Sequence, residues 1–341
     1  MRPRNLNSSV FGVRCSATRG SVLIYVVWMV LLLALFAAGV GSQALFALDL
    51  SQRLSDQLNA SYLARSAVTF AALRLERDPS PTFDGWNDVW ADAPTVLDRH
   101  ELAGGWFSVM GERLPNQGPK HGLVDEERRI NLNTAPGEVL LRLAEFAGGL
   151  REHEALALAD AIQDWRDEDD EQRPQGAENF FYHTLSQAYD CKDGPFENIE
   201  ELLLVRGVSR EVYERLEPFV TVYGSGRINL NTASEMVLRT LGLSHEGVLG
   251  VQRFRAGDDN QEGTGDDREL TAVGGLDAEL GAYVPAEDLA QLKQLVQHNA
   301  LSARSDAFRM AIDAEHGGPA NHVQVFCVID RQGAVKLWVE R

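Results

Sequence analysis

Two acidic segments carry the side chains best suited to chemistry in this sequence, and that chemistry is cation binding. The first acidic segment, residues 164–178, holds seven carboxylates within 15 residues, and Pro174 and Gly176 interrupt any helix so that it can curl. Hard oxygen ligands that converge from a flexible loop suit calcium. The alternative is a solvated acidic loop, which a run of like charges usually forms. The ligands expected here are Asp164, Asp167, Asp169, Asp170, Glu171 and Glu178.

The second acidic segment, residues 258–269, is close in pattern to the calcium-binding loop of an EF-hand. Oxygen-bearing side chains stand at loop positions 1, 3, 5, 9 and 12, and a glycine stands at position 6. Two positions depart from the pattern, because Glu262 is longer than the usual Asp or Asn and Gly265 replaces an apolar residue. A disordered acidic loop is the alternative. The expected ligands are Asp258, Asn260, Glu262, Asp266 and Glu269.

The sequence lacks the common motifs of catalysis. It has no glycine-rich phosphate loop and no Gly-x-Ser-x-Gly elbow, and His153-Glu154 is not followed by a second histidine at metalloprotease spacing. No aromatic-lined pair of carboxylates indicates a glycoside hydrolase. We therefore expect a protein that is not an enzyme.

The elements that would position the acidic segments begin with a long apolar helix. Residues 21–48 carry no charge, and the 20 residues before them contain four arginines and no acidic residue. About 20 apolar residues span the hydrocarbon core of a bilayer, and a positive flank stays in the cytoplasm. An apolar periodicity continues to Glu76 without a helix breaker, and Pro79 follows. We expect one helix over residues 21–76, anchored in the membrane, with the rest of the chain outside the cytoplasm.

Seven residues, Arg-Ile-Asn-Leu-Asn-Thr-Ala, occur twice, at 129–135 and at 227–233. A repeat of this length indicates an internal duplication. In each copy the threonine, Thr134 or Thr232, is expected to cap a leucine-rich helix, because a glutamate follows shortly after it.

Further amphipathic patterns follow the first copy. They predict helices over residues 152–165, 199–205 and 210–216, with Gly207 in a turn. Residues 129–300 are therefore expected to hold five or more short helices.

Strand patterns lie on both sides of this helical block, at 106–110 before it and at 307–313, 323–329 and 335–340 after it. The expected fold class is α+β, with a long N-terminal helix on a small antiparallel sheet and a large all-α insertion of helix-hairpin-helix or SAM-like type. The expected division is a leader at 1–20, the helix at 21–76, the first part of the sheet domain at 77–128, the helical insertion at 129–300 and the closing strands at 301–341.

The charge of the chain limits its partners. A formal net charge of −18 repels phosphate backbones and suits divalent cations or a basic partner. The stretch before Ser209 and the repeated motif are similar to helix-hairpin-helix DNA-binding modules, but phosphate contacts there need a second glycine where Ser209 stands. Outside the leader only Cys191 and Cys327 are present, and both pairing and free thiols are open.

The junction between the basic leader and the apolar helix resembles the class III signal of type IV pilins and type II secretion pseudopilins. Gly20 ends the leader and Ser21 begins the apolar run. The resemblance implies that prepilin peptidase cuts between them and methylates the new amino terminus. Most members carry glutamate at the fifth mature position, which is Tyr25 here, and its absence is a mark of the K class. A simple uncleaved anchor and a signal peptide cut after Ala44 are the alternatives.

Over nearly the whole chain the sequence is similar to the K-class minor pseudopilins of the type II secretion system, the GspK family. The similarity rests on the leader junction, on the repeated Ile-Asn-Leu-Asn-Thr-Ala and on a set of residues in and after the first acidic segment. These are Asp164-Trp165, Asp167 to Glu171, Gly176-Ala177-Glu178, Phe181-Tyr182, Ile199 to Leu202, Arg206-Gly207-Val208, Tyr213, Leu216 and, in the final strand, Trp338.

This resemblance implies a pilin-like arrangement of the long helix and the sheet. It also implies a protein at the tip of the secretion pseudopilus, where it primes assembly together with I- and J-class minor pseudopilins for the export of folded proteins. It places the chain in the inner membrane as a single-pass protein with its C-terminal domain in the periplasm, without nucleic acid as a partner. It also implies calcium in the helical domain, without matching individual ligands. The alternatives are a membrane-anchored helix-hairpin-helix DNA-uptake protein and an envelope protein unrelated to secretion.

Overall fold

The computed structural model describes residues 19–111 and 118–341, which belong to two compact units divided between Asp56 and Gln57. Helix α1 (Arg19–Glu76) contributes residues to both units, and this confirms the single helix expected over residues 21–76. Residues 1–18 of the expected leader lie outside the described residues, so cleavage and methylation at Gly20 and Ser21 stay predictions.

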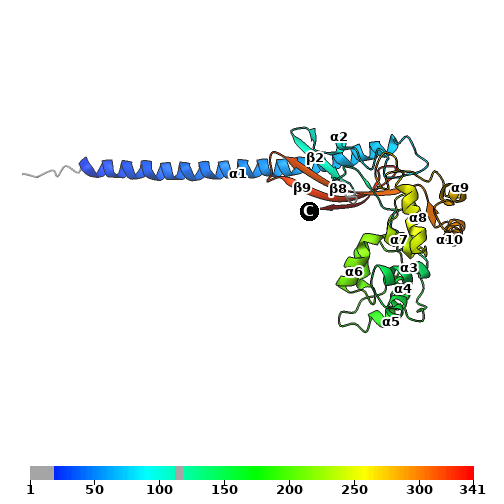
Figure 1. Ribbon diagram of the computed structural model, residues 1–341. Coiled ribbons are helices and arrows are strands. Elements are labelled where there is room, and N and C mark those ends of the chain that lie inside the picture. The colour runs from blue at the N-terminus through cyan, green and yellow to red at the C-terminus, as the bar shows by residue number, and fades with distance from the viewer. Residues whose placement is uncertain (1–18, 112–117) are drawn as a thin grey trace, which may run out of the picture. The chain divides into compact units, whose positions relative to one another are not determined.

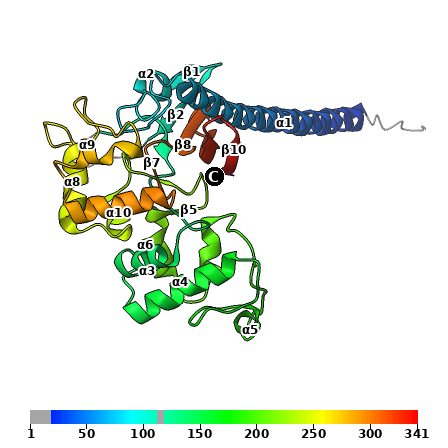
Figure 2. The ribbon, with the colours of Figure 1, turned by 90° about the vertical axis from the view of Figure 1, so that its right-hand side faces the viewer.

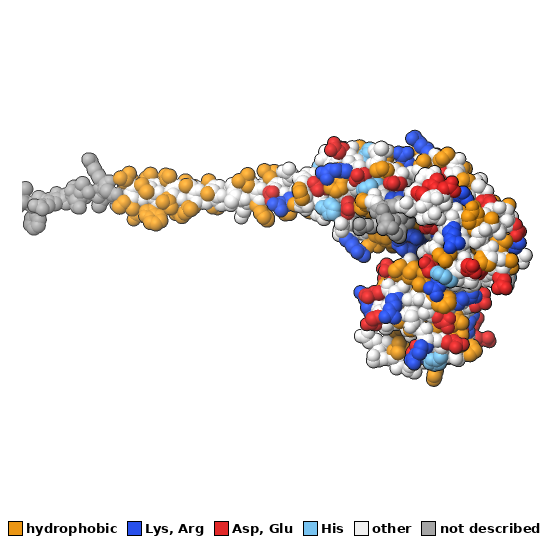
Figure 3. Space-filling view, viewed as in Figure 1, with side chains coloured by type: hydrophobic (Ala, Val, Ile, Leu, Met, Phe, Trp, Pro, Cys, Tyr) orange, Lys and Arg blue, Asp and Glu red, His pale blue; other side chains and the backbone are white. Residues whose placement is uncertain are grey.

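The first unit exposes a continuous apolar surface. From Val22 to Leu50 every described side chain of α1 is exposed, and Figure 3 shows apolar side chains along the visible face of this stretch. Its most apolar window has a mean hydropathy of 2.7, and it is long and apolar enough to cross a membrane. Apolar side chains on all sides of a helix are typical of a segment surrounded by lipid or by other helices.

In the second unit the rest of α1 packs on an antiparallel sheet (Figure 1). The buried residues recur at steps of three and four, so they form one stripe along the helix. The sheet has the strand order β1-β2-β8-β9-β10, and β3 also pairs with β8. The strands are β1 (His100–Leu102), β2 (Gly105–Met110), β3 (Val124–Asp125), β8 (Ala307–His316), β9 (His322–Asp330) and β10 (Val335–Glu340). The stripe on α1 consists of Ala60, Leu63, Ala64, Ala67, Val68, Ala71 and Leu75.

The four strands expected from sequence are present as β2, β8, β9 and β10, and the short β1 and β3 were not predicted. Strand β8 lies at the centre of the sheet and pairs with strands that come from before and after the helical residues. The fold is thus a mixed one, with a long N-terminal helix and an antiparallel sheet. Among residues 77–99, all of which are described, the one helix between α1 and β1 is the four-residue α2 (Pro94–Leu97).

Between β3 and β8 the chain is mainly helical, and these helices share one buried core. Figures 1 and 2 show them as a green group, α3 to α6, and a yellow to orange group, α7 to α10. The bounds are α3 (Gly137–Phe146), α4 (Glu152–Arg166), α5 (Asn179–Tyr182), α6 (Arg210–Leu216), α7 (Glu235–Thr240), α8 (His245–Arg255), α9 (Leu276–Leu280) and α10 (Ala286–Gln297). The predicted helices at 152–165 and 210–216 are confirmed as α4 and α6, whereas 199–205 forms a 3-10 helix, η1 (Ile199–Leu204), and Gly207 has the expected turn geometry with φ of +90°.

Two expectations for this region are wrong. The region is not all-α, because each copy of the repeated motif starts a short parallel ladder: β4 (Ile130–Asn131) pairs with β5 (Val220–Thr221), and β6 (Ile228–Asn229) pairs with β7 (Leu301–Ser302). The threonines do not cap the helices either. Helix α3 begins after Pro136, and α7 begins after Ser234, whose hydroxyl accepts a hydrogen bond from the Val237 amide.

The two motif copies have the same internal hydrogen bonds. Asn131 and Asn229 each accept a bond from the amide two residues later. The next asparagine then holds a distant residue through its main chain: Asn133 binds the amide and carbonyl of Phe196, and Asn231 binds those of Leu270. Two helices follow each motif, and a loop follows the second of them. Each motif therefore fixes the end of that loop, at Phe196 after α4 and at Leu270 after α8.

The start of each loop is also bound to the motif, through an arginine at the end of the preceding helix. Arg166, the last residue of α4, donates to the carbonyls of Leu132 and Ala135. Arg255, the last residue of α8, donates to the carbonyls of Leu230 and Ala233, which occupy the same places in the second copy. Each acidic segment thus lies in a loop that is fixed at both ends by its own copy of the motif.

Candidate metal centre

The first acidic segment is folded around the buried carboxylate of Asp164, on the last turn of α4. Arg173 lies 2.8 Å from Asp164 and also pairs with Asp167, so one guanidinium bridges two carboxylates. Gly176 passes so close that a Cβ atom there would lie 1.9 Å from an Asp164 oxygen. The segment therefore curls back over the end of α4, as its proline and glycine predict.

Three potential ligands meet beside this turn, in what we call the Glu178 group: Glu178, Cys191 and Asp193. One ligand atom from each lies within 4.8 Å of the others. Glu178 is 2% exposed, and neither of its carboxylate oxygens accepts a hydrogen bond. One oxygen of Asp193 and one of the neighbouring Asp167 are also buried without a hydrogen bond. Buried carboxylate oxygens without partners are rare and costly, so this arrangement favours a bound cation.

The electrostatics of the Glu178 group agree with its geometry. Burial raises the pKa of Glu178 to about 7, and the nearby carboxylates of Asp164, Asp193 and Asp167 add to the rise. Burial also raises the pKa of the Cys191 thiol well above its ordinary value, so the sulfur is neutral. The carboxyl oxygens of Glu178 and Asp193, with Asp167 alongside, form a hard ligand set of the kind that calcium prefers.

The structure brings together only part of the ligand set expected from the first acidic segment. Glu178 is in the group, and Asp164 and Asp167 border it while paired with Arg173. The others lie on the exposed part of the loop, where Asp169 accepts a bond from the amide of Glu171 and Asp170 contacts the side chain of Asn179.

Sequence reasoning missed Cys191 and Asp193. They follow α5 and are separated from Glu178 by more than a dozen residues, so spacing alone did not point to them. The available signal was an aspartate followed by Gly194 in a turn, where Asp193 adopts a positive φ of 48°. Aspartate tolerates that backbone conformation better than most residues.

The second acidic segment does not gather its ligands. Asp266 accepts bonds from the amides of Asp258 and Asp259, at 2.7 and 3.0 Å, and Glu262 pairs with Arg255. Asn260 and Asp258 are exposed, and Asp258 pairs with Arg268. Glu269 points elsewhere, toward the amide of Asn87. No three ligand side chains of residues 258–269, all of which are described, meet around one point, and no helix directly follows Glu269, as an EF-hand requires.

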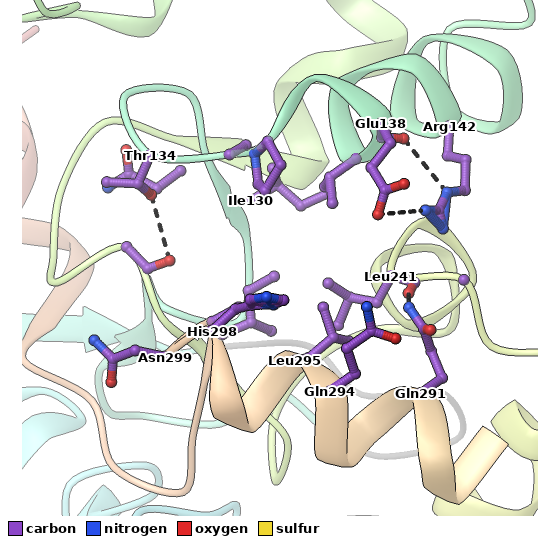
Figure 4. A pocket seen from close by; sticks show the side chains of 18 of the residues that line it. Ile130, Thr134, Glu138, Arg142, Leu241, Gln291, Gln294, Leu295, His298 and Asn299 are labelled. Carbon is purple, nitrogen blue, oxygen red and sulfur yellow. Dashed lines mark hydrogen bonds and ion pairs between the residues drawn. The ribbon is translucent and has the colours of Figure 1, made fainter. Parts of the chain in front are cut away.

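A cleft of about 850 Å³ lies between the two motif copies and is lined by α3 and α10 (Figure 4). Glu138 and Arg142 of α3 pair with each other at 3.1 Å, and Gln291 of α10 donates to the carbonyl of Leu241. Apolar side chains, among them Leu295, separate these polar groups. Glu138, Arg142 and Gln291 are thus used within the fold, and the side chains that line the cleft do not pair a nucleophile with an adjacent base.

Two further predicted features have a structural role. The hydroxyl of Ser209 accepts a bond from the Val212 amide and caps α6, which supports a packing role for the helix-hairpin-helix-like stretch. Cys191 and Cys327 are both buried and free, so they do not form a disulfide.

The chain is similar to components of one bacterial machine. A family model described as "Type II secretion system (T2SS), protein K" matches residues 123–225. A type II secretion system protein K of Klebsiella pneumoniae is 27% identical over 63% of this chain and 66% of that protein. The protein K of Pectobacterium carotovorum subsp. carotovorum is 26% identical over 71% of this chain and 77% of that protein.

A solved structure has the same fold. It is a chain from the crystal structure of the GspK–GspI–GspJ complex of the type 2 secretion system of enterotoxigenic Escherichia coli. The similarity has a TM-score of 0.63 at 21% identity and covers 85% of this chain and 98% of that chain.

Proposed function

We propose that this chain, which belongs to the type II secretion protein K family, acts as a minor pseudopilin at the tip of the secretion pseudopilus. The observation that carries the proposal is the combination of the protein K match at residues 123–225 with an α1 whose exposed apolar part precedes a part packed on an antiparallel sheet. The apolar part gives the chain a surface for neighbouring helices, and the sheet-packed part holds the globular unit.

In this proposal α1 is processed before it assembles. Prepilin peptidase removes residues 1–20 and methylates Ser21, and the apolar helix then lies in the inner membrane as a single span with the remaining domains in the periplasm. Tyr25 stands at the fifth mature position instead of a glutamate. A buried glutamate in an apolar bundle is costly unless it meets the amino terminus of a subunit above it. A subunit at the tip has none above it, so Tyr25 fits that place.

The partners in this proposal are the I- and J-class minor pseudopilins, because the solved relative comes from a complex of GspK with GspI and GspJ. The helices between β3 and β8 form a helical domain inserted into the pilin-like sheet domain. Such a domain is too bulky for the shaft of a filament, which is a steric reason for a terminal position. The chain performs no catalysis and primes assembly of the filament that exports folded proteins.

Calcium binding at the Glu178 group is the second part of the proposal. Glu178 and Asp193 hold the ion, with Asp167 alongside, and the ion supplies the positive charge that these buried oxygens lack. Bound in this way, it fixes the first acidic segment against the loop that carries Asp193. The helical domain then presents a rigid surface at the tip.

Mass spectrometry of the protein purified from membranes tests the processing step. The proposal predicts an amino-terminal peptide that begins at N-methylated Ser21. An intact Met1, or a start at Leu45, would overturn it.

The alternative function, DNA uptake, has less support, because the relatives named above are secretion proteins. Salt-dependent binding to a DNA duplex separates the two functions. The secretion role predicts no binding at physiological salt.

A further inference from the structure

The Glu178 group contains a thiol that calcium does not require. The Sγ atom of Cys191 lies within 4.8 Å of a carboxylate oxygen of Glu178 and of one of Asp193. Cys191 is 5% exposed, so its sulfur meets these carboxylates in the interior of the protein. Calcium binds oxygen ligands, whereas thiolate sulfur selects softer metals such as zinc. Calcium alone therefore leaves the sulfur in this group without a role.

Asn179, the first residue of α5, holds Cys191 in its position. The side-chain oxygen of Asn179 accepts a hydrogen bond from the amide of Cys191 at 2.8 Å, and its side-chain nitrogen donates to Asp193 at 3.4 Å. Asn179 also follows Glu178 directly in the sequence, so one residue connects all three members of the group. Residues that orient metal ligands from behind in this way are typical of metal sites. The thiol itself has a long contact, 3.8 Å, with the main-chain carbonyl of Asp164.

The carboxylate of Glu178 gives an observation that is independent of the thiol. The residue is 2% exposed, and neither of its carboxylate oxygens accepts a hydrogen bond. The arginine of this region, Arg173, pairs with Asp164 and Asp167 and not with Glu178. One oxygen of Asp193 is also buried without a hydrogen bond. Buried carboxylate oxygens without a partner indicate a ligand at the place where the sulfur also lies.

We propose that Cys191 is a metal ligand and that the Glu178 group binds a thiophilic divalent cation of the zinc type through Cys191, Glu178 and Asp193. This inference builds on the cation site proposed above and adds a metal that competes with calcium there. Zinc accepts both thiolate and carboxylate ligands, and three protein ligands leave its fourth position for water. On binding, the Sγ–H bond breaks, the proton leaves to solvent and the sulfur electron pair forms the bond to the metal.

The spacing of the group allows the smaller ion. Zinc binds sulfur at about 2.3 Å and carboxylate oxygen at about 2.0–2.2 Å, so its ligand atoms must lie closer together than the 4.8 Å that bounds this group. The carboxylate of Glu178 can turn toward the sulfur, because no hydrogen bond holds it. Zinc and calcium need the same two carboxylates, so binding of one metal excludes the other.

Cobalt(II) is the probe that tests this inference, because it replaces zinc and gives a sulfur-to-metal charge-transfer band only when a thiolate binds it. The full-length protein is studied in detergent as the variant C15S/C327A, in which Cys191 is the one remaining cysteine. We expect the band to appear when CoCl2 is added and to disappear when zinc is added. Absence of the band in this variant would overturn the inference.

A matched pair of single substitutions in the C15S background assigns the sulfur. C191S should abolish the band and C327A should keep it, because Cys327 is equally buried and free but lies in β9, in the core of the sheet. C191S should also lower the ratio of zinc to calcium affinity, measured by calorimetry, by about tenfold or more, as expected when a metal site loses a supporting group. Circular dichroism confirms that each variant is folded. An equal band in folded C191S would contradict the proposal.

The same samples separate this inference from the calcium proposal. Calcium binding without a cobalt–sulfur band in the C15S/C327A protein would overturn the role of Cys191 and leave the calcium site in place. A cobalt–sulfur band without calcium binding would support the role of Cys191 and overturn the calcium site.

Discussion

The two copies of Arg-Ile-Asn-Leu-Asn-Thr-Ala build the same framework and use it for different ends. In both, an arginine at the end of a helix binds two carbonyls of the motif, and an asparagine of the motif binds a residue beyond the acidic segment. The first copy spans a long loop between Arg166 and Phe196, whereas the second spans a short one between Arg255 and Leu270.

The difference in loop length explains why the carboxylates of the two acidic segments have different partners. The long loop returns past its own start and brings Asp193 to Glu178, where unpartnered oxygens collect. In the short loop Arg255 forms an ion pair with Glu262, and two backbone amides donate to the carboxylate of Asp266. Similar acidic content thus leaves buried carboxylate oxygens without hydrogen bonds in one copy and gives a turn with internally paired carboxylates in the other. The density of acidic residues is a weaker guide to metal binding than the number of donors within reach.

The largest difference between the copies should come from the two arginines. Arg255 is buried and binds two carbonyls and Glu262, so R255M leaves buried acceptors without donors and should lower the free energy of unfolding by about 3–5 kcal/mol. Arg166 is only partly buried, and R166M should cost about 1–3 kcal/mol. Urea unfolding of both full-length variants checks this order. Equal costs would show that the two frameworks do not differ in this respect.

The second largest difference between the two copies should be in how much calcium stabilises the folded protein. At free calcium about 100 times its dissociation constant, one site stabilises the folded protein by about 2.7 kcal/mol. E178Q should lose the share of this stabilisation that comes from the Glu178 group, and E262Q in the second copy should keep it. Thermal unfolding with calcium and with EGTA measures both. A loss in E262Q as large as that in E178Q would place the ion in the wrong copy.

The anchoring asparagines should show a smaller difference. Asn231 is buried and makes two bonds to Leu270, whereas Asn133 is partly exposed and makes two to Phe196. N231A should therefore cost about 2–3 kcal/mol and N133A about 1 kcal/mol. Hydrogen exchange at the amides of Leu270 and Phe196 gives a local readout. N133A should increase exchange at Phe196 and leave Leu270 unchanged.

The smallest effect concerns pH in the absence of calcium. Because the pKa of Glu178 is raised to about 7 in the folded protein, the folded state binds an extra proton between the ordinary value and about 7. Its contribution to stability is therefore present below that range and is lost as the pH rises through about 7. E178Q should make the profile flatter in EGTA. D266N in the second copy should leave the loss in place, since the pKa of Asp266 is lowered by its hydrogen bonds.

Much of the fold follows from local patterns in the sequence. A regular apolar periodicity within one segment predicted several elements correctly. These are the long helix, the strands β2, β8, β9 and β10, and the helices α4 and α6. Two-residue ladders such as β4 with β5 have no periodicity to read, because their partners lie about 90 residues apart. Ser234 caps α7 in place of the expected Thr232, because the hydroxyl of Thr232 donates to the buried carboxylate of Asp125.

The candidate sites were harder to predict from the sequence than the fold. Glu178 could be predicted because it lies in a dense acidic segment, but Asp193 reaches it only through the path of the long loop. Asp84 likewise meets Ser305 and Arg331 only in the folded chain, because these residues come from the other end of the sequence. Sequence spacing indicates which carboxylates share a loop, and tertiary contacts decide which of them lie close together.

Co-purification of the full-length chain with the I- and J-class minor pseudopilins of its own organism tests the central claim most directly. After co-expression in membranes and extraction in detergent, we expect all three to elute as one complex on an affinity tag carried by this chain, and to separate when charged residues are placed on the exposed apolar part of α1. Elution of this chain alone, under conditions where the I and J partners bind each other, would contradict its assignment as a minor pseudopilin of the tip.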